Sequence, residues 1–247
     1  MVNLKTSYQI DELRELNLNI SQEEIFSNLS NENCDDFLKI FSIINIEKID
    51  NIDQAHIFIH HLTNHSNPLR EAVALKLDEL FTAKKFEYYD DKILEQYLKA
   101  LTDINPNICR VICNILSINS VISEKLQASI LSEIKKSILK IKEYQEDSGD
   151  FFDNNIRNKK NHAKNKILFS LYWLLEGLSY CRCEKYNSEV LEILKFTINF
   201  CDYTIREKTA KILAGFTNAP YDLLQIAKND QNFYVKNQVY DKINFED

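Results

Sequence analysis

Glycine and proline are so scarce in this chain that most β-rich and glycine-looped folds are ruled out. Only three glycines and three prolines occur among 247 residues, whereas the two together make up about 12% of an average protein. β-Hairpins need glycine-type turns, and nucleotide-binding sheets need glycine-rich phosphate loops. Helices joined by short polar turns remain. With 45% hydrophobic residues, the chain has enough apolar surface to form a continuous core.

Apolar residues recur at the 3.6-residue spacing of a helix along most of the chain, and polar capping residues separate the runs. Ser21 begins a capping box, while Pro68 and Pro106 stand where a first helical turn is expected. Two long helices are predicted, from Ser123 to Tyr144 and from about Asn155 to Leu178. In total we expect about twelve helices in consecutive hairpins and no strand.

Four of the predicted helices align without gaps as the second member of a pair. In each, an aliphatic residue is followed four places later by a small or branched residue and eight places later by another aliphatic one. Such a stripe can be buried only when neighbouring pairs stack. The core positions predicted from it are Leu69, Val73, Leu77, Ile108, Ile112, Leu116, Ile205, Leu213, Val235 and Ile243.

A basic residue follows the aliphatic one in three of the four segments, as Arg70, Arg206 and Lys236, whereas Cys109 takes this place in the fourth. The pattern resembles the inner helix of HEAT-like, armadillo-type repeats and covers about residues 33–245. The resemblance implies an all-α fold, a right-handed α-solenoid of about five to six HEAT-like helical hairpins. It also implies that the arginines are structural and tie adjacent turns together.

We interpret residues 1–247 as a single solenoid domain. The acidic, asparagine-rich residues 1–35 suit an N-terminal cap, whose outer face must be polar, and residues 147–160 are expected to form an inserted loop between the two long helices. Residues 1–60 carry four basic against eleven acidic side chains, whereas residues 125–166 carry ten against six. An acidic end and a basic middle are therefore combined in a chain of net charge -7.

Four of the five histidines lie within ten residues, at two interleaved i,i+4 spacings that can hold zinc. No carboxylate or thiol completes the ligand set at a matching offset, so we expect packed or exposed histidines and no metal. These residues are His56, His60, His61 and His65. The six cysteines lie mostly in apolar helical patterns and are expected to be reduced thiols of a cytoplasmic protein. No apolar stretch has the length of a signal or a membrane span.

No general acid, base, nucleophile or phosphate loop stands out, so we predict a non-catalytic protein without a cofactor. HEAT-like solenoids present extended concave surfaces, and the resemblance therefore implies a protein-binding module, monomeric on its own. We expect a small bacterial protein that captures one basic partner, for example an immunity protein neutralising a toxin. A HEAT-like scaffold or cofactor-attachment factor is the alternative. A HEAT-like DNA glycosylase for alkylated bases is a further one, which the acidic charge disfavours because phosphate binding needs basic surface.

Two groups of residues are candidates for partner binding. The first comprises residues two places after the aliphatic position, which point to the other side of the inner helix and form a ridge on its concave face. These are Glu71, Arg110, Glu207 and Asn237. The second lies in the inserted loop, where two aromatic rings are flanked by carboxylates and either anchor a partner or fold back onto the solenoid. These are Asp150, Phe151, Phe152 and Asp153.

Overall fold

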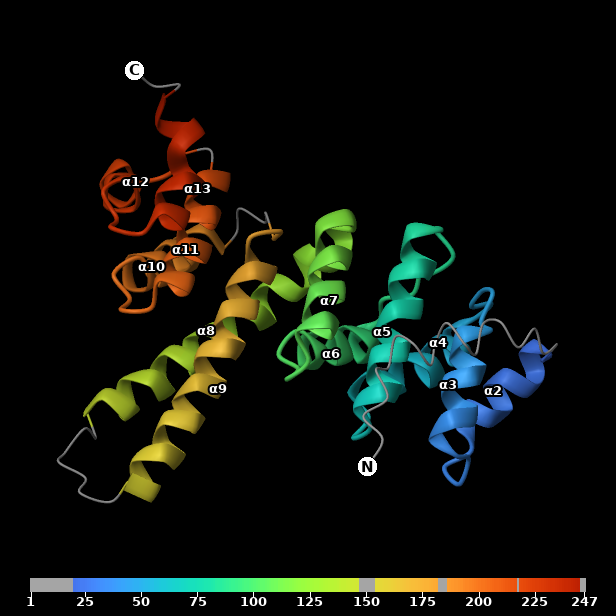
Figure 1. Ribbon diagram of the computed structural model, residues 1–247. Helices are drawn as coiled ribbons and strands as arrows, with labels where there is room; N and C mark the ends of the chain where they lie inside the picture. Colours follow the sequence, from blue (N-terminus) through green and yellow to red (C-terminus); the bar gives the residue numbers. More distant parts are fainter. Residues whose placement is uncertain (1–19, 147–153, 182–185, 217, 245–247) are drawn as a thin grey trace. The chain divides into compact units, whose positions relative to one another are not determined.

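All regular structure in the described part of the chain is helical. The computed structural model describes residues 20–146, 154–181, 186–216 and 218–244 (Figure 1). These residues form twelve α-helices and one short 3-10 helix, with no strand among them. The prediction of an all-α protein is confirmed. The chain divides into two compact units, residues 1–122 and 123–247, where the sequence had been interpreted as one domain.

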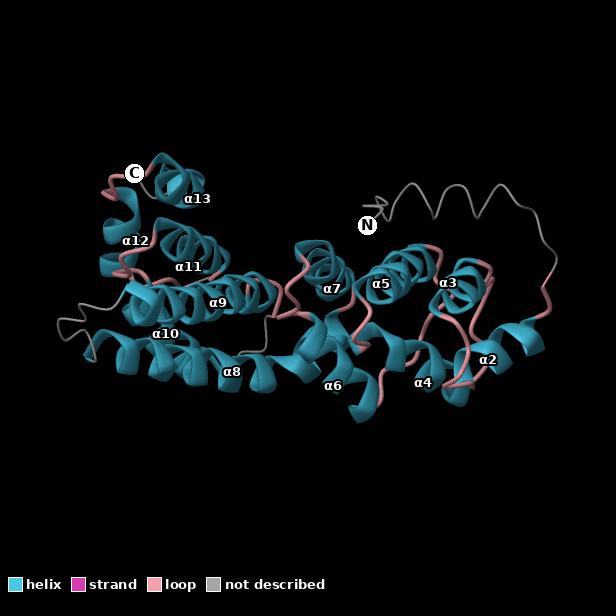
Figure 2. Ribbon diagram, turned by 60° about the horizontal axis from the view of Figure 1, so that its bottom comes forward, coloured by secondary structure: helices cyan, strands magenta, loops and turns pink. Residues whose placement is uncertain are grey.

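The helices of unit 1 form two packed series. Its elements are α2 (Gln22–Ser30), α3 (Asp36–Ile44), α4 (Ile52–His60), the 3-10 helix η1 (His61–Thr63), α5 (Asn67–Thr82), α6 (Asp91–Ala100) and α7 (Pro106–Ile118). Helix α5 packs between α3 and α7, while α4 packs between α2 and α6. Figure 2 shows α3, α5 and α7 side by side in one row of this unit and α4 and α6 in another. Alternate helices along the chain therefore form alternate layers.

In unit 2, helix α11 is the central element. The helices are α8 (Ser120–Glu146), which begins three residues before the boundary, α9 (Asn154–Leu178), α10 (Asn187–Thr197), α11 (Tyr203–Gly215), α12 (Tyr221–Lys228) and α13 (Phe233–Asn244). Helix α11 packs against α9, α10, α12 and α13. Residues 154–160, which the sequence analysis assigned to an inserted loop, are the first residues of α9. That boundary was wrong, because the polar run Asn-Asn-Ile-Arg-Asn-Lys-Lys has no helix breaker.

Helix starts follow the capping residues. The Ser21 hydroxyl accepts a hydrogen bond from the Glu24 amide at 3.2 Å, as the capping box requires. Pro106 is the first residue of α7, and Pro68 is the second of α5, where a missing N–H leaves no helical bond unmade. Helix α8 extends three residues before the predicted Ser123. Element types were therefore predicted correctly, with ends displaced by a few residues.

The predicted core stripe is buried. Nine of its ten residues are no more than 1% exposed, and the tenth, Ile243, has a side chain outside the described residues. Trp173 is also buried. The aliphatic positions of α5, α7, α11 and α13 thus form the centre of each unit.

Candidate functional site

An arginine in unit 1 joins the starts of two neighbouring helices. The Arg70 guanidinium on α5 donates from Nε and Nη2 to the two carboxylate oxygens of Asp103, at 2.7 and 3.1 Å. Its Nη1 donates to the carbonyls of Asn64 and His65, and Asp103 in turn accepts from the amide of Asn105, the N-cap of α7. We call this arrangement the arginine clamp. It fixes the loop before α5 to the loop before α7.

Unit 2 contains a second arginine clamp with the same carboxylate and carbonyl contacts, although only Arg70 also donates to a side chain at the start of its own helix, that of Asn67 at 3.3 Å. Arg206 on α11 donates to both oxygens of Asp230, at 2.6 and 3.1 Å, and to the carbonyls of Phe200 and Cys201. Asp230 accepts from the amide of Asn232, just before α13. The Arg206 guanidinium holds the pKa of the Asp230 carboxyl below its ordinary value. Both arginines therefore have the tying role that the sequence resemblance implied.

Cys109 holds the clamp position on α7, where no arginine is present. Its thiol donates to the carbonyl of Asp103 at 3.1 Å, so it contacts the same loop as Arg70. Burial raises the pKa of Cys109 to about 12, and the group remains a protonated thiol at neutral pH. The cysteine is therefore structural.

When the sequences of the two units are aligned on their clamp residues, one difference between the units stands out. When Arg70 is matched to Arg206, the first residue of α5, Asn67, corresponds to Tyr203, the first of α11. When Asp103 is matched to Asp230, Pro106 and Asn107 of α7 correspond to Phe233 and Tyr234 of α13. Aromatic residues in unit 2 thus replace two asparagines and a proline in unit 1.

We call Tyr203, Phe233 and Tyr234 the aromatic patch. The rings of Tyr203 and Tyr234 are stacked, with centroids 6.5 Å apart and planes inclined by 26°, and Phe233 meets Tyr234 edge-on. All three are exposed, by 42%, 69% and 60% respectively. The sequence analysis missed this patch. Whether an aromatic side chain at the start of a helix is exposed cannot be predicted until the residue at which the helix begins is known.

The predicted ridge residues lie in two pairs, one in each unit. Glu71 is half-buried and accepts from the side-chain amides of Asn105 and Asn107, at 3.3 and 2.9 Å. Glu207 likewise accepts from Gln238 on α13. Both carboxylates link neighbouring helices. The other two, Arg110 and Asn237, are exposed.

The loop candidates Asp150, Phe151, Phe152 and Asp153 lie outside the described residues. Their part in partner binding stays a prediction.

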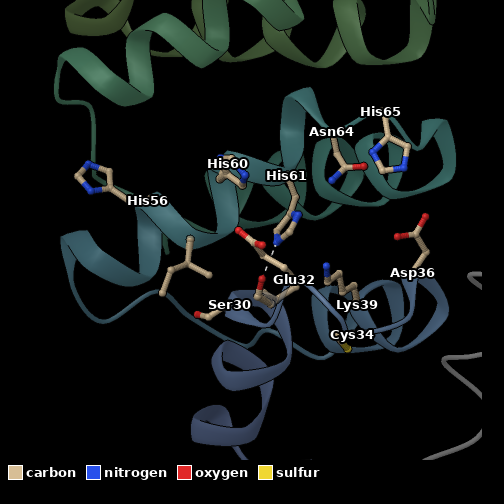
Figure 3. Close-up of a pocket in the computed structure, with 12 residues that line it drawn as sticks. Ser30, Glu32, Cys34, Asp36, Lys39, His56, His60, His61, Asn64 and His65 are labelled. Carbon is tan, nitrogen blue, oxygen red and sulfur yellow. Dashed lines mark hydrogen bonds between the residues drawn. The ribbon is translucent and has the colours of Figure 1, made fainter.

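The histidine-rich segment lines a cavity of about 580 Å³ in unit 1 (Figure 3). His61 is buried and donates from Nε2 to the Leu29 carbonyl at 2.9 Å. His56 contacts the Asp90 carboxylate at 2.7 Å, and His60 and His65 are exposed. Nowhere in the described residues do three or more histidine, cysteine or acidic side chains converge as metal ligands do. The lining residues are Leu29, Ser30, Glu32, Cys34, Asp36, Lys39, His56, Ile57, His60, His61, Asn64 and His65.

A buried carboxylate on α9 joins two lysines of α11. Glu176 Oε1 accepts from Lys211 at 2.6 Å and from the Tyr180 hydroxyl at 2.9 Å, and Oε2 lies 3.1 Å from the Lys208 ammonium. Burial by itself would raise the pKa of Glu176, but the two ammonium groups outweigh burial, so that its pKa is lowered. This network holds α9 to α11.

The chain was compared with protein families and with curated proteins. No protein-family model matches the chain, and no curated protein matches it either. None of the described helices combines the length and the apolar character needed to cross a bilayer. The five described cysteines form no disulfide.

Proposed function

We propose that this chain is a non-catalytic, HEAT-like α-solenoid of about five to six helical hairpins that captures one protein partner in the cytoplasm. Two features support the repeat architecture. Within unit 1 alternate helices pack in series, and the same arginine clamp occurs in both units. A helical hairpin can bury its apolar stripe only by stacking on its neighbours. The arginine clamps hold neighbouring helices in such a stack.

The aromatic patch is the observation that carries a binding role. The arginine clamp forms in unit 1 with asparagine at the positions of Tyr203 and Tyr234, so the fold does not need aromatic rings there. Large exposed rings that do not serve the core are typical of protein interfaces, where tyrosine and other aromatic residues carry much of the binding energy. We therefore assign the partner contact to the starts of α11 and α13.

The chemistry around the aromatic patch favours a basic partner. Asp202 directly precedes Tyr203, whereas unit 2 as a whole carries 19 basic against 18 acidic side chains. The faces of tyrosine rings attract guanidinium groups, with about 0.5–2 kcal/mol for each contact. A partner segment that bears arginine would therefore complement the exposed rings.

The test exchanges the patch for its counterpart in unit 1. A Tyr203→Asn, Tyr234→Asn double variant should keep its free energy of unfolding within about 1 kcal/mol, because exposed side chains contribute little to folding. Partner capture from an extract of the source organism, measured by quantitative mass spectrometry, should weaken by about 2 kcal/mol or more. Tyr221→Asn is the matched control, because Tyr221 is 68% exposed but lies outside the patch.

Two outcomes separate this surface from the loop candidates. If the double variant captures the same proteins as the parent chain, the aromatic patch is not the contact. A Phe151→Ala, Phe152→Ala variant that alone abolishes capture would transfer the binding role to the inserted loop.

A further inference from the structure

One lysine of unit 1 is buried without a counter-charge. Lys39 on α3 is only 6% exposed and lines the histidine cavity. Other buried lysines have carboxylate partners: Lys76 contacts Glu79 at 3.0 Å, and Lys208 contacts Glu176 at 3.1 Å. Lys39 forms neither an ion pair nor a hydrogen bond with any residue in the described segments. The Lys39 ammonium has no counter-ion among the described residues, so the cavity beside it is suited to an anionic group.

His61 adds an unmet acceptor to the wall of the same cavity. Its Nε2 donates to the Leu29 carbonyl, and burial lowers the pKa of the ring, which therefore stays neutral at pH 7. The remaining nitrogen, Nδ1, then carries a lone pair. It is buried and finds no donor among the described residues. A group that donates a hydrogen bond is therefore needed near Lys39.

Asn64 provides a second donor to the cavity. Its Oδ1 accepts from the Ser66 amide at 2.9 Å, which fixes the orientation of the side chain. In Figure 3 the Asn64 amide nitrogen faces the side of the His61 ring that carries Nδ1, and the Lys39 ammonium lies across the cavity from it. The wall thus presents one cation, one amide donor and one neutral acceptor.

The rim of the cavity determines which anion fits. Glu32 and Asp36 also line it. Two carboxylates repel a dianion such as phosphate, but they attract an ammonium group. A ligand whose carboxylate and ammonium groups are attached to the same carbon atom complements both the floor and the rim.

We propose that this cavity, formed by α2, α3, α4 and η1, binds a free α-amino acid. The carboxylate of the ligand contacts Lys39 and the Asn64 amide. Its ammonium group faces Glu32 and donates to His61, whereas Asp36 lies on the opposite side of the cavity in Figure 3. A peptide terminus presents only one of the two charges and fits less well. The volume of about 580 Å³ lies within the roughly 300–1,000 Å³ of small-molecule sites. This proposal is independent of the aromatic patch, which lies in unit 2.

The first experiment measures binding to the full chain by isothermal titration calorimetry. The twenty common amino acids are the probes, with acetate, methylamine and inorganic phosphate as head-group controls. At least one amino acid should bind saturably, and at least about tenfold more tightly than acetate or methylamine, because each of these offers half of the charged contacts. If no amino acid binds, or if acetate binds as tightly as the best one, the proposal is wrong.

The second experiment measures amino-acid affinity in variants of the cavity residues, to test whether the ligand binds in this cavity. Lys39→Met should weaken binding at least about tenfold, whereas Lys76→Met, which alters another buried lysine of the same unit, should leave it within about twofold. Asn64→Ala, at a half-buried position, provides a second test if Lys39→Met does not fold. Unchanged affinity in the variants that fold would exclude this cavity as the site.

Discussion

At the scale of single residues, the structure depends on a few buried ion pairs. Arg70 and Asp103 have side chains 9% and 12% exposed, and Arg206 and Asp230 are 18% and 7% exposed. Removing one member of such a pair leaves a charge without a partner, which costs about 3–5 kcal/mol. The clamps therefore set the register of neighbouring helices and penalise any other register.

The ion pairs of Glu176 predict how the stability of unit 2 depends on pH. Its pKa lies below the ordinary 4.5 because Lys211 and Lys208 outweigh the effect of burial. A carboxyl with a depressed pKa stabilises the folded state above its ordinary pKa, and this stabilisation is lost as the pH falls through the folded-state value. Glu176→Gln should therefore lower the free energy of unfolding by about 3 kcal/mol at pH 7.

The difference in the free energy of unfolding between the parent protein and Glu176→Gln should narrow as the pH falls below 4.5, because the parent carboxyl then also becomes neutral. Urea denaturation of both proteins between pH 3 and 7 measures this difference. A difference that stays constant across this range would show that the loss comes from packing and not from charge.

Sequence reasoning predicted some of these residues and missed others for a physical reason. Arg70 and Arg206 were found because they occupy the same place in an aligned helical pattern. Glu176 was not predicted to have a role, since its partners lie 32 and 35 residues further along the chain. Pairing over such separations depends on how helices pack, and no local pattern records it.

At the scale of helices, the apolar stripe was sufficient to predict both type and burial. Capping residues and helical periodicity are local signals, and they identified the elements with small errors at the ends. The inserted loop was predicted to extend to residue 160, seven residues into α9, because the first turns of α9 are largely polar and show no stripe. The aromatic patch was missed because its rings meet only when α11 and α13 lie side by side.

Helix α7 allows the stripe to be tested on a single element. Leu116 is 1% exposed, whereas Ile118 on the same helix is 60% exposed. Leu116→Ala should lower the free energy of unfolding by about 2–5 kcal/mol, because it removes packed methyl groups and leaves a cavity. Ile118→Ala should change it by no more than about 0.5 kcal/mol. Chemical denaturation compares the two, and equal effects would contradict the assignment of the buried face.

At the scale of the whole molecule, the histidine-rich segment leads to a prediction about metal content. His61 is engaged by Leu29 and His56 by Asp90, so the described residues do not offer a convergent ligand set. Elemental analysis of the purified chain should find less than about one zinc ion per molecule. Stoichiometric zinc that disappears in a His56→Ala, His60→Ala variant would overturn this expectation.

The arginine clamps also bear on how such a chain can diverge. The bonded residues are 33 positions apart in unit 1 and 24 apart in unit 2, yet the arginine–aspartate contact is the same. The segment between them contains α6 in one case and the shorter α12 in the other. A contact that holds only the starts of the helices lets the intervening outer segment gain or lose residues during evolution. The connections that precede α6 and α12 are accordingly the places where an inserted tag or reporter should be tolerated best, because those that follow them contain the clamp aspartates.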